Sequence, residues 1–300
     1  MRCTLCPRQC GHRSGVCGET DELRLAVASI HFGEEPPLVG KGGSGTIFVS
    51  GCNLGCIFCQ NSQISHYGLG RTVNSVTFAR ICLMLEEYGA ENLNIVTGSH
   101  ALPALVEGIC TAKAMGCSLP IFWNSSGYET VEAVEFLAPF IDGFMPDLKT
   151  LDSPVAAALF HAPDYPSVAQ QALLAMVRHS KIHYRGSILR SGVIVRHLVV
   201  PGFLDSTYRV IKWFAEHLRY KALFSLMTQY VPVHAGPQRQ INEQEYKQVL
   251  RWLQECAIEG GFFQELVTDT AWLPDFNQAN PFSSALSTPL WHWREGFLSY

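Results

Sequence analysis

The sequence predicts an α/β fold built around a parallel sheet. Short apolar runs rich in β-branched and aromatic residues alternate along the chain with longer helical patterns, which is typical of βαβ units. The predicted strands cover residues 46–49, 93–96, 120–123, 143–145, 193–200 and 223–230. The predicted helices cover roughly residues 75–89, 102–116, 128–138, 166–180, 205–219 and 242–258. About six such units fit a partial (β/α)6 barrel, whose chemistry belongs at the carboxyl ends of the strands.

Several of the helix starts carry residues that cap or begin helices. Asn74-Ser75 precedes the first helix, Pro103 stands early in the second, and Asp205-Ser206 precedes the fifth. Asn242, followed three residues later by Glu245, forms a capping-box pattern at the sixth. These signals support the predicted boundaries independently of the hydrophobic pattern.

One more strand is predicted before the βαβ units, at residues 23–32. The segment Glu34-Glu35-Pro36-Pro37 ends it, because proline has no N–H to donate to a sheet. Residues 41–45 are rich in glycine but lack the pattern of a phosphate-binding loop, and they precede a strand rather than a helix. We therefore predict a flexible turn there.

Composition excludes several classes of protein. The chain is 47% hydrophobic and 16% charged, so it can bury a large core without needing disulfides or metal ions for stability. A net charge of −4 without a basic run argues against nucleic-acid binding. We find no apolar stretch long enough for a membrane span and no signal peptide. Eleven cysteines, an odd number with seven in two tight groups, favour metal-bound thiols in a reducing cytoplasm over disulfides.

The strongest motif is a group of three cysteines, Cys52, Cys56 and Cys59, at C-x3-C-x2-C spacing directly after the strand at 46–49. Thiolates are soft ligands that select zinc, copper(I) or iron–sulfur clusters. Gly51 and Gly55 let the loop curl, so the three thiols can meet at one centre. Three thiolates leave a four-iron cluster one ligand short, which creates an open coordination site for chemistry. The alternatives are a zinc knuckle or three unrelated buried thiols.

This loop, with Phe58 before its last cysteine, resembles that of the radical S-adenosylmethionine (SAM) superfamily. The resemblance implies a partial barrel and a [4Fe–4S] cluster whose open iron chelates the amino and carboxylate groups of SAM. It also implies an oxidoreductase that splits SAM to a 5'-deoxyadenosyl radical, with an electron from a flavodoxin- or ferredoxin-like donor.

A second group of cysteines, Cys3, Cys6, Cys10 and Cys17, lies near the N-terminus. Four thiols at these spacings can close a tetrahedral zinc site or ligate a whole iron–sulfur cluster. Spacing does not decide between the two metals, and a pair of redox-active thiols without metal is the alternative. A fully ligated site has no open position, so we expect its role to be structural or electron-relaying.

Polar residues follow most of the predicted strands, where a parallel barrel places its site. The resemblance gives them roles in SAM binding. Gly98 and Ser99 stand where the superfamily's Gly-Gly-Glu segment holds the amino group, although this chain has one glycine and no carboxylate there. Asp147 and Lys149, in a Met-Pro-Asp-Leu-Lys run, resemble the ribose or amine acceptor and the carboxylate partner of pyruvate formate-lyase activating enzymes. A surface ion pair is the alternative for these two residues.

Four more residues complete the predicted SAM site. Asn124 and Ser125 follow the strand at 120–123. Arg196 and His197 alternate along a strand, so only one of them should face the barrel interior, and we predict Arg196. His234, in a Pro-x-His segment, resembles a histidine near the SAM adenosine, with a loop-filling role as the alternative.

The whole chain resembles the PflX-like branch of that superfamily, which is grouped with pyruvate formate-lyase activating enzymes. The resemblance implies a protein substrate from which a glycine hydrogen is taken. A modifying enzyme for a peptide or small molecule with an auxiliary N-terminal cluster is one alternative, and a non-catalytic iron–sulfur or zinc module is another. We expect an N-terminal Cys-rich segment at 1–45 packed on the barrel, a radical SAM barrel at 46–270, and an irregular aromatic cover at 271–300 that shields the open side or docks a protein substrate.

Overall fold

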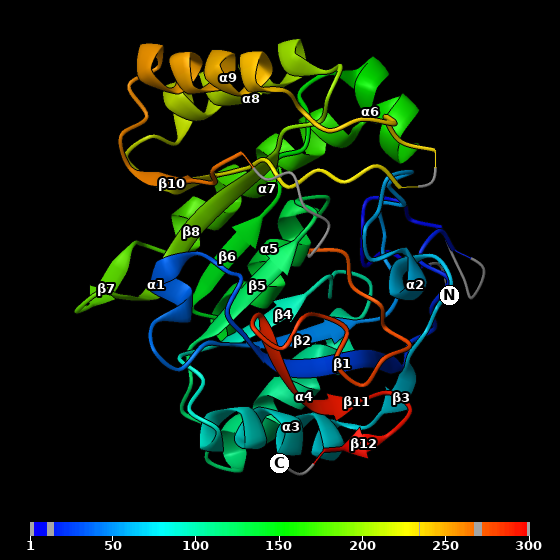
Figure 1. Ribbon diagram of the computed structural model, residues 1–300. Helices are drawn as coiled ribbons and strands as arrows, with labels where there is room; N and C mark the ends of the chain where they lie inside the picture. Colours follow the sequence, from blue (N-terminus) through cyan, green and yellow to red (C-terminus); the bar gives the residue numbers. More distant parts are fainter. Residues whose placement is uncertain (1–2, 11–14, 234, 267–271, 299–300) are drawn as a thin grey trace.

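The computed structural model describes residues 3–10, 15–233, 235–266 and 272–298 (Figure 1). In that part of the chain the strands form one open sheet, in the order β10-β9-β8-β6-β5-β4-β2-β1-β11-β12. The seven parallel strands are β2 (Ser44–Val49), β4 (Leu93–Val96), β5 (Ile121–Ser125), β6 (Gly143–Pro146), β8 (Ile188–Leu198), β9 (Leu223–Met227) and β10 (Gly261–Phe263). Because the order begins at β10 and ends at β12 without closing, the prediction of a partial barrel is confirmed.

The antiparallel half of the sheet contains elements that the sequence does not predict. β1 (Leu23–His31) pairs with β2, with β3 (Arg71–Val73) and with β11 (Ser287–His292), and β12 (Gly296–Phe297) pairs with β11. The expectation of an irregular C-terminal tail is therefore wrong over β11 and β12. The physical reason is an unpaired edge of β1, which β11 satisfies with backbone hydrogen bonds while Leu290 and Trp291 become buried.

The predicted helices are all present with small shifts in their ends. They are α3 (Ser75–Glu87), α4 (Leu102–Ala114), α5 (Val131–Leu137), α7 (Tyr165–His179), α8 (Leu204–His217) and α9 (Glu243–Glu255). The capping box of Asn242 and Glu245 is present, and Asn74 accepts the N–H of Thr77. α5 begins three residues later than predicted, because the side chain of Thr130 caps it.

The sequence pattern misses the short elements. These are α1 (Pro36–Val39), α2 (Ser62–Ser65), the 3-10 turn η1 (Ala138–Phe140), α6 (Ser153–Phe160) and β7 (His183–Arg185). Most are too short for hydrophobic periodicity to register. Among the described residues, no helix is long and apolar enough to cross a bilayer.

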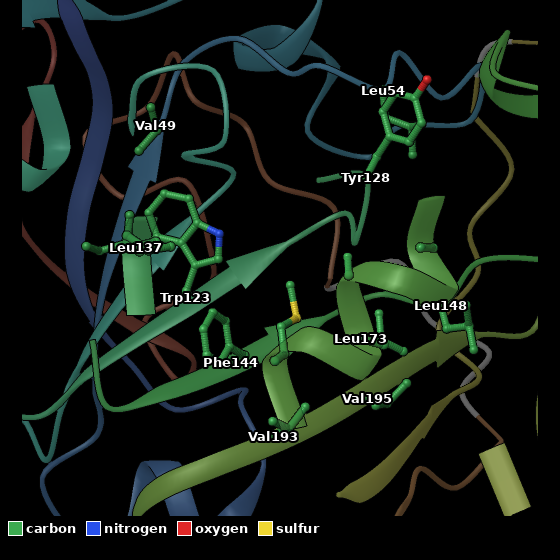
Figure 2. Close-up of a cluster of buried hydrophobic side chains, with 14 of the residues drawn as sticks. Val49, Leu54, Trp123, Tyr128, Leu137, Phe144, Leu148, Leu173, Val193 and Val195 are labelled. Atoms are coloured by element: carbon green, nitrogen blue, oxygen red, sulfur yellow. The ribbon is translucent and has the colours of Figure 1, made fainter. Parts of the chain in front are cut away.

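Hydrophobic layers on both faces of the strands hold the barrel together. The helices and the sheet share the larger one, in which Trp123, Phe144 and Val193 of β5, β6 and β8 pack near Leu137 and Leu173 of α5 and α7 (Figure 2). The smaller layer lies on the other face of the strands, where Leu38 of α1 packs with apolar side chains that include Phe122, Met145 and Ile194. α1 therefore closes one end of the barrel interior and leaves the carboxyl ends of the strands free.

Tyr165, at the start of α7, ties two of those strand ends together. Its fully buried hydroxyl lies 2.9 Å from the carbonyl oxygens of both Ser126 and Asp147, to which it can donate. It also accepts the backbone N–H of Lys149 at 2.9 Å. One side chain thus satisfies polar backbone groups after both β5 and β6, which strands leave unpaired where they end.

We predict that Tyr165→Phe lowers the free energy of unfolding by about 1–3 kcal/mol, because it leaves buried backbone groups without their partner. Urea unfolding followed by circular dichroism measures this change. Tyr184→Phe, at the largely exposed β7, is the matched control and should change stability by less than about 0.5 kcal/mol. Equal effects of the two substitutions would contradict the role given to Tyr165.

Candidate active site

The three-cysteine loop leaves β2 at Val49 and returns toward the strand ends. Cys52, Cys56 and Cys59 all line one cavity of about 650 Å³. Both glycines of the loop have the positive φ that glycine adopts freely, +85° at Gly51 and +76° at Gly55. A side chain at Gly51 would also collide with Glu19 and the backbone of Cys17, so the loop is pressed closely against the N-terminal segment.

Burial disfavours the charged form of two of the three thiols, those of Cys56 and Cys59. Burial raises the pKa of Cys56 and of Cys59, and the neighbouring cysteines of the motif raise both further because their negative charges would repel. Thiolates gathered in this way are stable only with a positive centre between them. The loop also offers hydrogen bonds of the kind that tune cluster sulfurs, from the N–H of Leu54 to Cys52 Sγ at 3.4 Å and between Ser65 Oγ and Cys59 Sγ at 3.2 Å.

The donor set fits a cluster better than a single ion. In the described residues, no three cysteine, histidine or acidic side chains stand close enough to hold one metal ion. A four-iron cluster binds each thiolate to a different iron, so its sulfurs stand farther apart than the ligands of one ion. No fourth cysteine is present among the residues that line the cavity, which agrees with an open iron.

Asp147 and Lys149 follow β6 and line the same cavity. Lys149 Nζ donates to Asp147 Oδ2 at 2.6 Å, and the two side chains are 17% and 23% exposed. Burial alone would lower the pKa of Lys149, but Asp147 and the Cys56 thiol outweigh it and raise that pKa. A cation held beside the cysteine loop is placed to receive a carboxylate.

Arg196 and His197 alternate on β8 as predicted. Arg196 lines the cavity, where its Nε donates to Glu35 Oε1 at 2.9 Å and its Nη2 pairs with both Glu34 and Glu35. His197 points away from it and bonds the carbonyl of Leu148 at 2.7 Å and the hydroxyl of Thr207 at 3.0 Å.

Comparison with known proteins decides the family. The sequence profile of the radical SAM superfamily matches residues 46–213, more than half of the chain, from β2 into α8. The chain belongs to the radical SAM superfamily. An uncharacterized protein of Methanocaldococcus jannaschii is 30% identical over an alignment of 238 residues, and the match covers 74% of this chain and 65% of that protein. The chain thus spans a little less than two thirds of this curated relative.

Solved structures agree with the radical SAM fold. Streptococcus suis SuiB bound to S-adenosylmethionine aligns with a TM-score of 0.51 at 14% identity, over 74% of this chain and 49% of SuiB. Methylornithine synthase aligns with a TM-score of 0.50 at 13% identity, over 73% of this chain and 70% of that one. At these identities the likeness concerns the fold alone.

The remaining predicted SAM residues fall into two groups. Asn124 and Ser125 line the cavity, whereas Gly98 and Ser99 do not. Gly98 is pressed against Trp123, and the Ser99 hydroxyl donates to Glu129 at 2.8 Å. Their neighbour Thr97, with φ of +63°, reaches the cavity instead. His234 lies outside the described residues.

Glu129 is a buried residue that sequence reasoning misses. It accepts hydrogen bonds from the hydroxyls of Ser99 and Ser125, both at 2.8 Å, and from the indole N–H of Trp123 at 2.6 Å. Burial raises the pKa of this carboxyl despite those bonds. Glu129 thus links the segment that follows β4 to the end of β5. Its only signal in the sequence is a polar Asn-Ser-Ser-Gly-Tyr-Glu run directly after a strand.

The N-terminal cysteines lie next to the cluster loop. Arg8 donates to the carbonyls of Asn53 at 3.0 Å and Leu54 at 2.8 Å, inside the loop, and to those of Phe160 and His161 at the end of α6. Burial, with smaller contributions from Cys10, Cys17 and Cys3, raises the pKa of Cys6 to about 11, so the four thiols share one neighbourhood. The structure brings the two cysteine groups side by side, as Figure 1 shows for the N-terminal segment and α2.

We predict a pH dependence of stability from His197. Burial lowers its pKa to about 4, from about 6.5 in an unfolded chain, although Leu148 and Asp147 oppose the change. Between these values the unfolded chain binds a proton that the folded chain refuses, so this part of the stability is complete above pH 6.5 and is lost as the pH falls toward 4. His197→Gln should reduce the difference in unfolding free energy between pH 7 and pH 4.5 by about 2–3 kcal/mol.

Urea unfolding at the two pH values measures this effect, with His179→Gln at the exposed end of α7 as the control. A pH difference that His197→Gln leaves as large as that of the control would refute the assignment.

Proposed function

We propose that this chain is a radical SAM enzyme, an oxidoreductase in which Cys52, Cys56 and Cys59 hold a [4Fe–4S] cluster and the cavity holds SAM. The observation that carries the proposal is the convergence of three thiols, Cys56 buried and Cys52 and Cys59 partly buried, on one cavity at the strand ends that no fourth cysteine of the described residues lines. When bound and reduced, the cluster would supply the electron that splits SAM into methionine and a 5'-deoxyadenosyl radical.

The residues of the cavity would bind and orient SAM. Lys149, a buried cation beside Cys56, suits the methionine carboxylate, and Asp147 suits the ribose hydroxyls. Thr97, Asn124 and Ser125 add polar groups from the ends of β4 and β5. Ser99 would act indirectly, through the Glu129 carboxylate that it shares with Ser125. Arg196 is already paired with the carboxylates of Glu34 and Glu35. We therefore give it no direct contact with SAM in this proposal.

We predict that Cys56→Ala abolishes both cluster assembly and SAM cleavage. The anaerobically purified chain is reconstituted with iron and sulfide and then given SAM and dithionite. Iron content and 5'-deoxyadenosine report the two steps. Cys110→Ala removes an exposed thiol and should retain both activities.

Product formation by the Cys56→Ala variant would overturn the cluster assignment. Absence of SAM binding to the wild-type chain in equilibrium dialysis would favour the non-catalytic module instead.

We propose that the radical takes a hydrogen atom from a carbon of a partner molecule. In an enzyme like the activating enzymes, that carbon would belong to a glycine of a partner protein. A flavodoxin- or ferredoxin-like protein would deliver the electron. The resemblance of the Met-Pro-Asp-Leu-Lys run to pyruvate formate-lyase activating enzymes supports this choice. A peptide- or small-molecule-modifying enzyme with an auxiliary cluster is the second candidate, and the four N-terminal thiols beside the cluster loop favour it.

We propose that Cys3, Cys6, Cys10 and Cys17 hold a second metal centre, zinc or [4Fe–4S]. The cluster is favoured, because in the described residues no three cysteine side chains stand close enough to hold one metal ion. Cys10, Cys17 and Cys3 all contribute to the raised pKa of Cys6, which supports one neighbourhood for the four thiols, and Arg8 connects this segment to the three-cysteine loop. Cys6→Ala/Cys10→Ala should remove about one zinc or about four irons per chain relative to Cys110→Ala. Elemental analysis of the purified proteins makes this measurement. Unchanged zinc and iron contents would refute the second centre.

A further inference from the structure

The floor of the barrel interior is a buried layer of charged and polar side chains. The segment between β1 and α1 crosses from the β1 side of the sheet to β8, with β2, β4, β5 and β6 between them in the strand order (Figure 1). It thereby carries Glu34 and Glu35 into the interior, where they meet Arg196 of β8. Glu34 and Arg196 line the same cavity as the three cysteines, so this floor is reached from the proposed SAM site.

The charges of this layer do not balance. Two carboxylates face one guanidinium, which leaves one negative charge in a place where Arg196 and Glu35 are only 8% and 7% exposed. Burial raises the pKa of Glu35, but Arg196 outweighs it and holds the pKa below its usual range, so Glu35 is ionised at neutral pH. An uncompensated buried charge is costly, and a bound cation would remove that cost.

Two buried polar atoms beside Glu34 have no hydrogen-bond partner. His31 is 6% exposed and lines the cavity, and its Nδ1 is unpaired. Asn94 is fully buried, and its Oδ1 is unpaired while its amide donates to Glu34 Oε1 at 2.9 Å. Burial lowers the pKa of His31, although the nearby Glu34 opposes the change. The ring is therefore neutral near pH 7, and one of its nitrogens can accept a hydrogen bond.

We propose that this layer binds the primary ammonium group of an alkyl amine substrate. An ammonium group has three N–H donors and one positive charge. Glu34 and His31 Nδ1 offer acceptors from residues that line the cavity. Asn94 donates to the Glu34 carboxylate, and the layer has one negative charge too many. The cavity wall above it includes Phe48, Trp272 and Phe282, which suit the methylene chain that carries such a group. This inference rests on the proposed function, because it names the substrate class of that site.

Isothermal titration calorimetry on the chain of 300 residues tests this subsite with n-pentylammonium chloride as the probe and 1-pentanol as the uncharged control. The wild-type chain should bind the ammonium and not the alcohol. Glu34→Gln should weaken binding at least about tenfold. Glu107→Gln, on the exposed face of α4, should leave it unchanged. Equal binding of the alcohol, or no effect of Glu34→Gln, would overturn the inference.

A second variant guards against misfolding, since Glu34 also pairs with Arg196. His31→Phe keeps the ring contact with Phe282 but removes the acceptor, so it should weaken pentylammonium binding severalfold while the thermal midpoint shows a folded chain. Unweakened binding in folded His31→Phe would count against the site.

Displacement of the probe by equimolar potassium chloride would assign the site to a metal cation and overturn the proposal of an amine. Binding of an N-acetyl-lysine amide probe would indicate that the substrate amine belongs to a peptide side chain. Binding of pentylammonium alone would indicate a free small amine.

Failure of this inference is distinguishable from failure of the proposed function. The Cys52/Cys56/Cys59 triple alanine variant lacks the cluster ligands but keeps the floor, so it should bind pentylammonium as the wild type does. SAM cleavage by the wild type without any ammonium binding would overturn the subsite alone. Ammonium binding without SAM cleavage would overturn the proposed function alone. If Glu34→Gln weakens S-adenosylmethionine but not pentylammonium, the negative charge serves the sulfonium cofactor, and the amine inference fails.

Discussion

The ion pairs of Arg196 with Glu34 and Glu35 join the two sides of a barrel that does not close. β1 and β8 are separated by four strands, yet the segment after β1 reaches β8 through these contacts and continues into α1. Buried ion pairs contribute little net stability, because desolvation offsets the attraction, but removing one partner leaves an unpaired buried charge. The pairs therefore act mainly to fix where the segment lies. The position of α1 follows from that placement, and with it the apolar layer formed around Leu38.

A second constraint acts at the other end of the barrel, where backbone carbonyls of the cluster loop need donors. The guanidinium of Arg8 supplies them to Asn53 and Leu54, and it stacks on the ring of Tyr128 at 5.3 Å from the ring centroid. Arginine suits this position because its planar fork carries five donors. The same side chain reaches the end of α6. One residue from the N-terminal cysteine motif thus sets the geometry of the loop that holds the other three cysteines.

The sequence predicts the parts of this structure that depend on local patterns. Strand and helix periodicity place the βαβ units, and alternation on β8 turns Arg196 inward. The spacing of Cys52, Cys56 and Cys59 predicts the loop whose three thiols line one cavity. Contacts between distant residues leave no such pattern. Glu35 is 161 residues from its partner Arg196, and a Glu-Glu-Pro-Pro run reads equally well as an exposed turn. The hydrogen bond of Ser99 is not predicted for the same reason, since its partner Glu129 is 30 residues away.

The two ends of the cavity differ in what they can hold. The rim carries soft thiols and the Asp147–Lys149 pair, which suit a metal cluster and a zwitterionic cofactor. The floor carries a fixed negative charge and unpaired acceptors, which suit a donor with a positive charge. A molecule anchored at the floor would extend along the aromatic wall toward the rim, so the depth of the cavity would select which carbon lies near the cofactor. Holding both partners in one enclosed space supplies orientation and excludes water, and a highly reactive intermediate needs both.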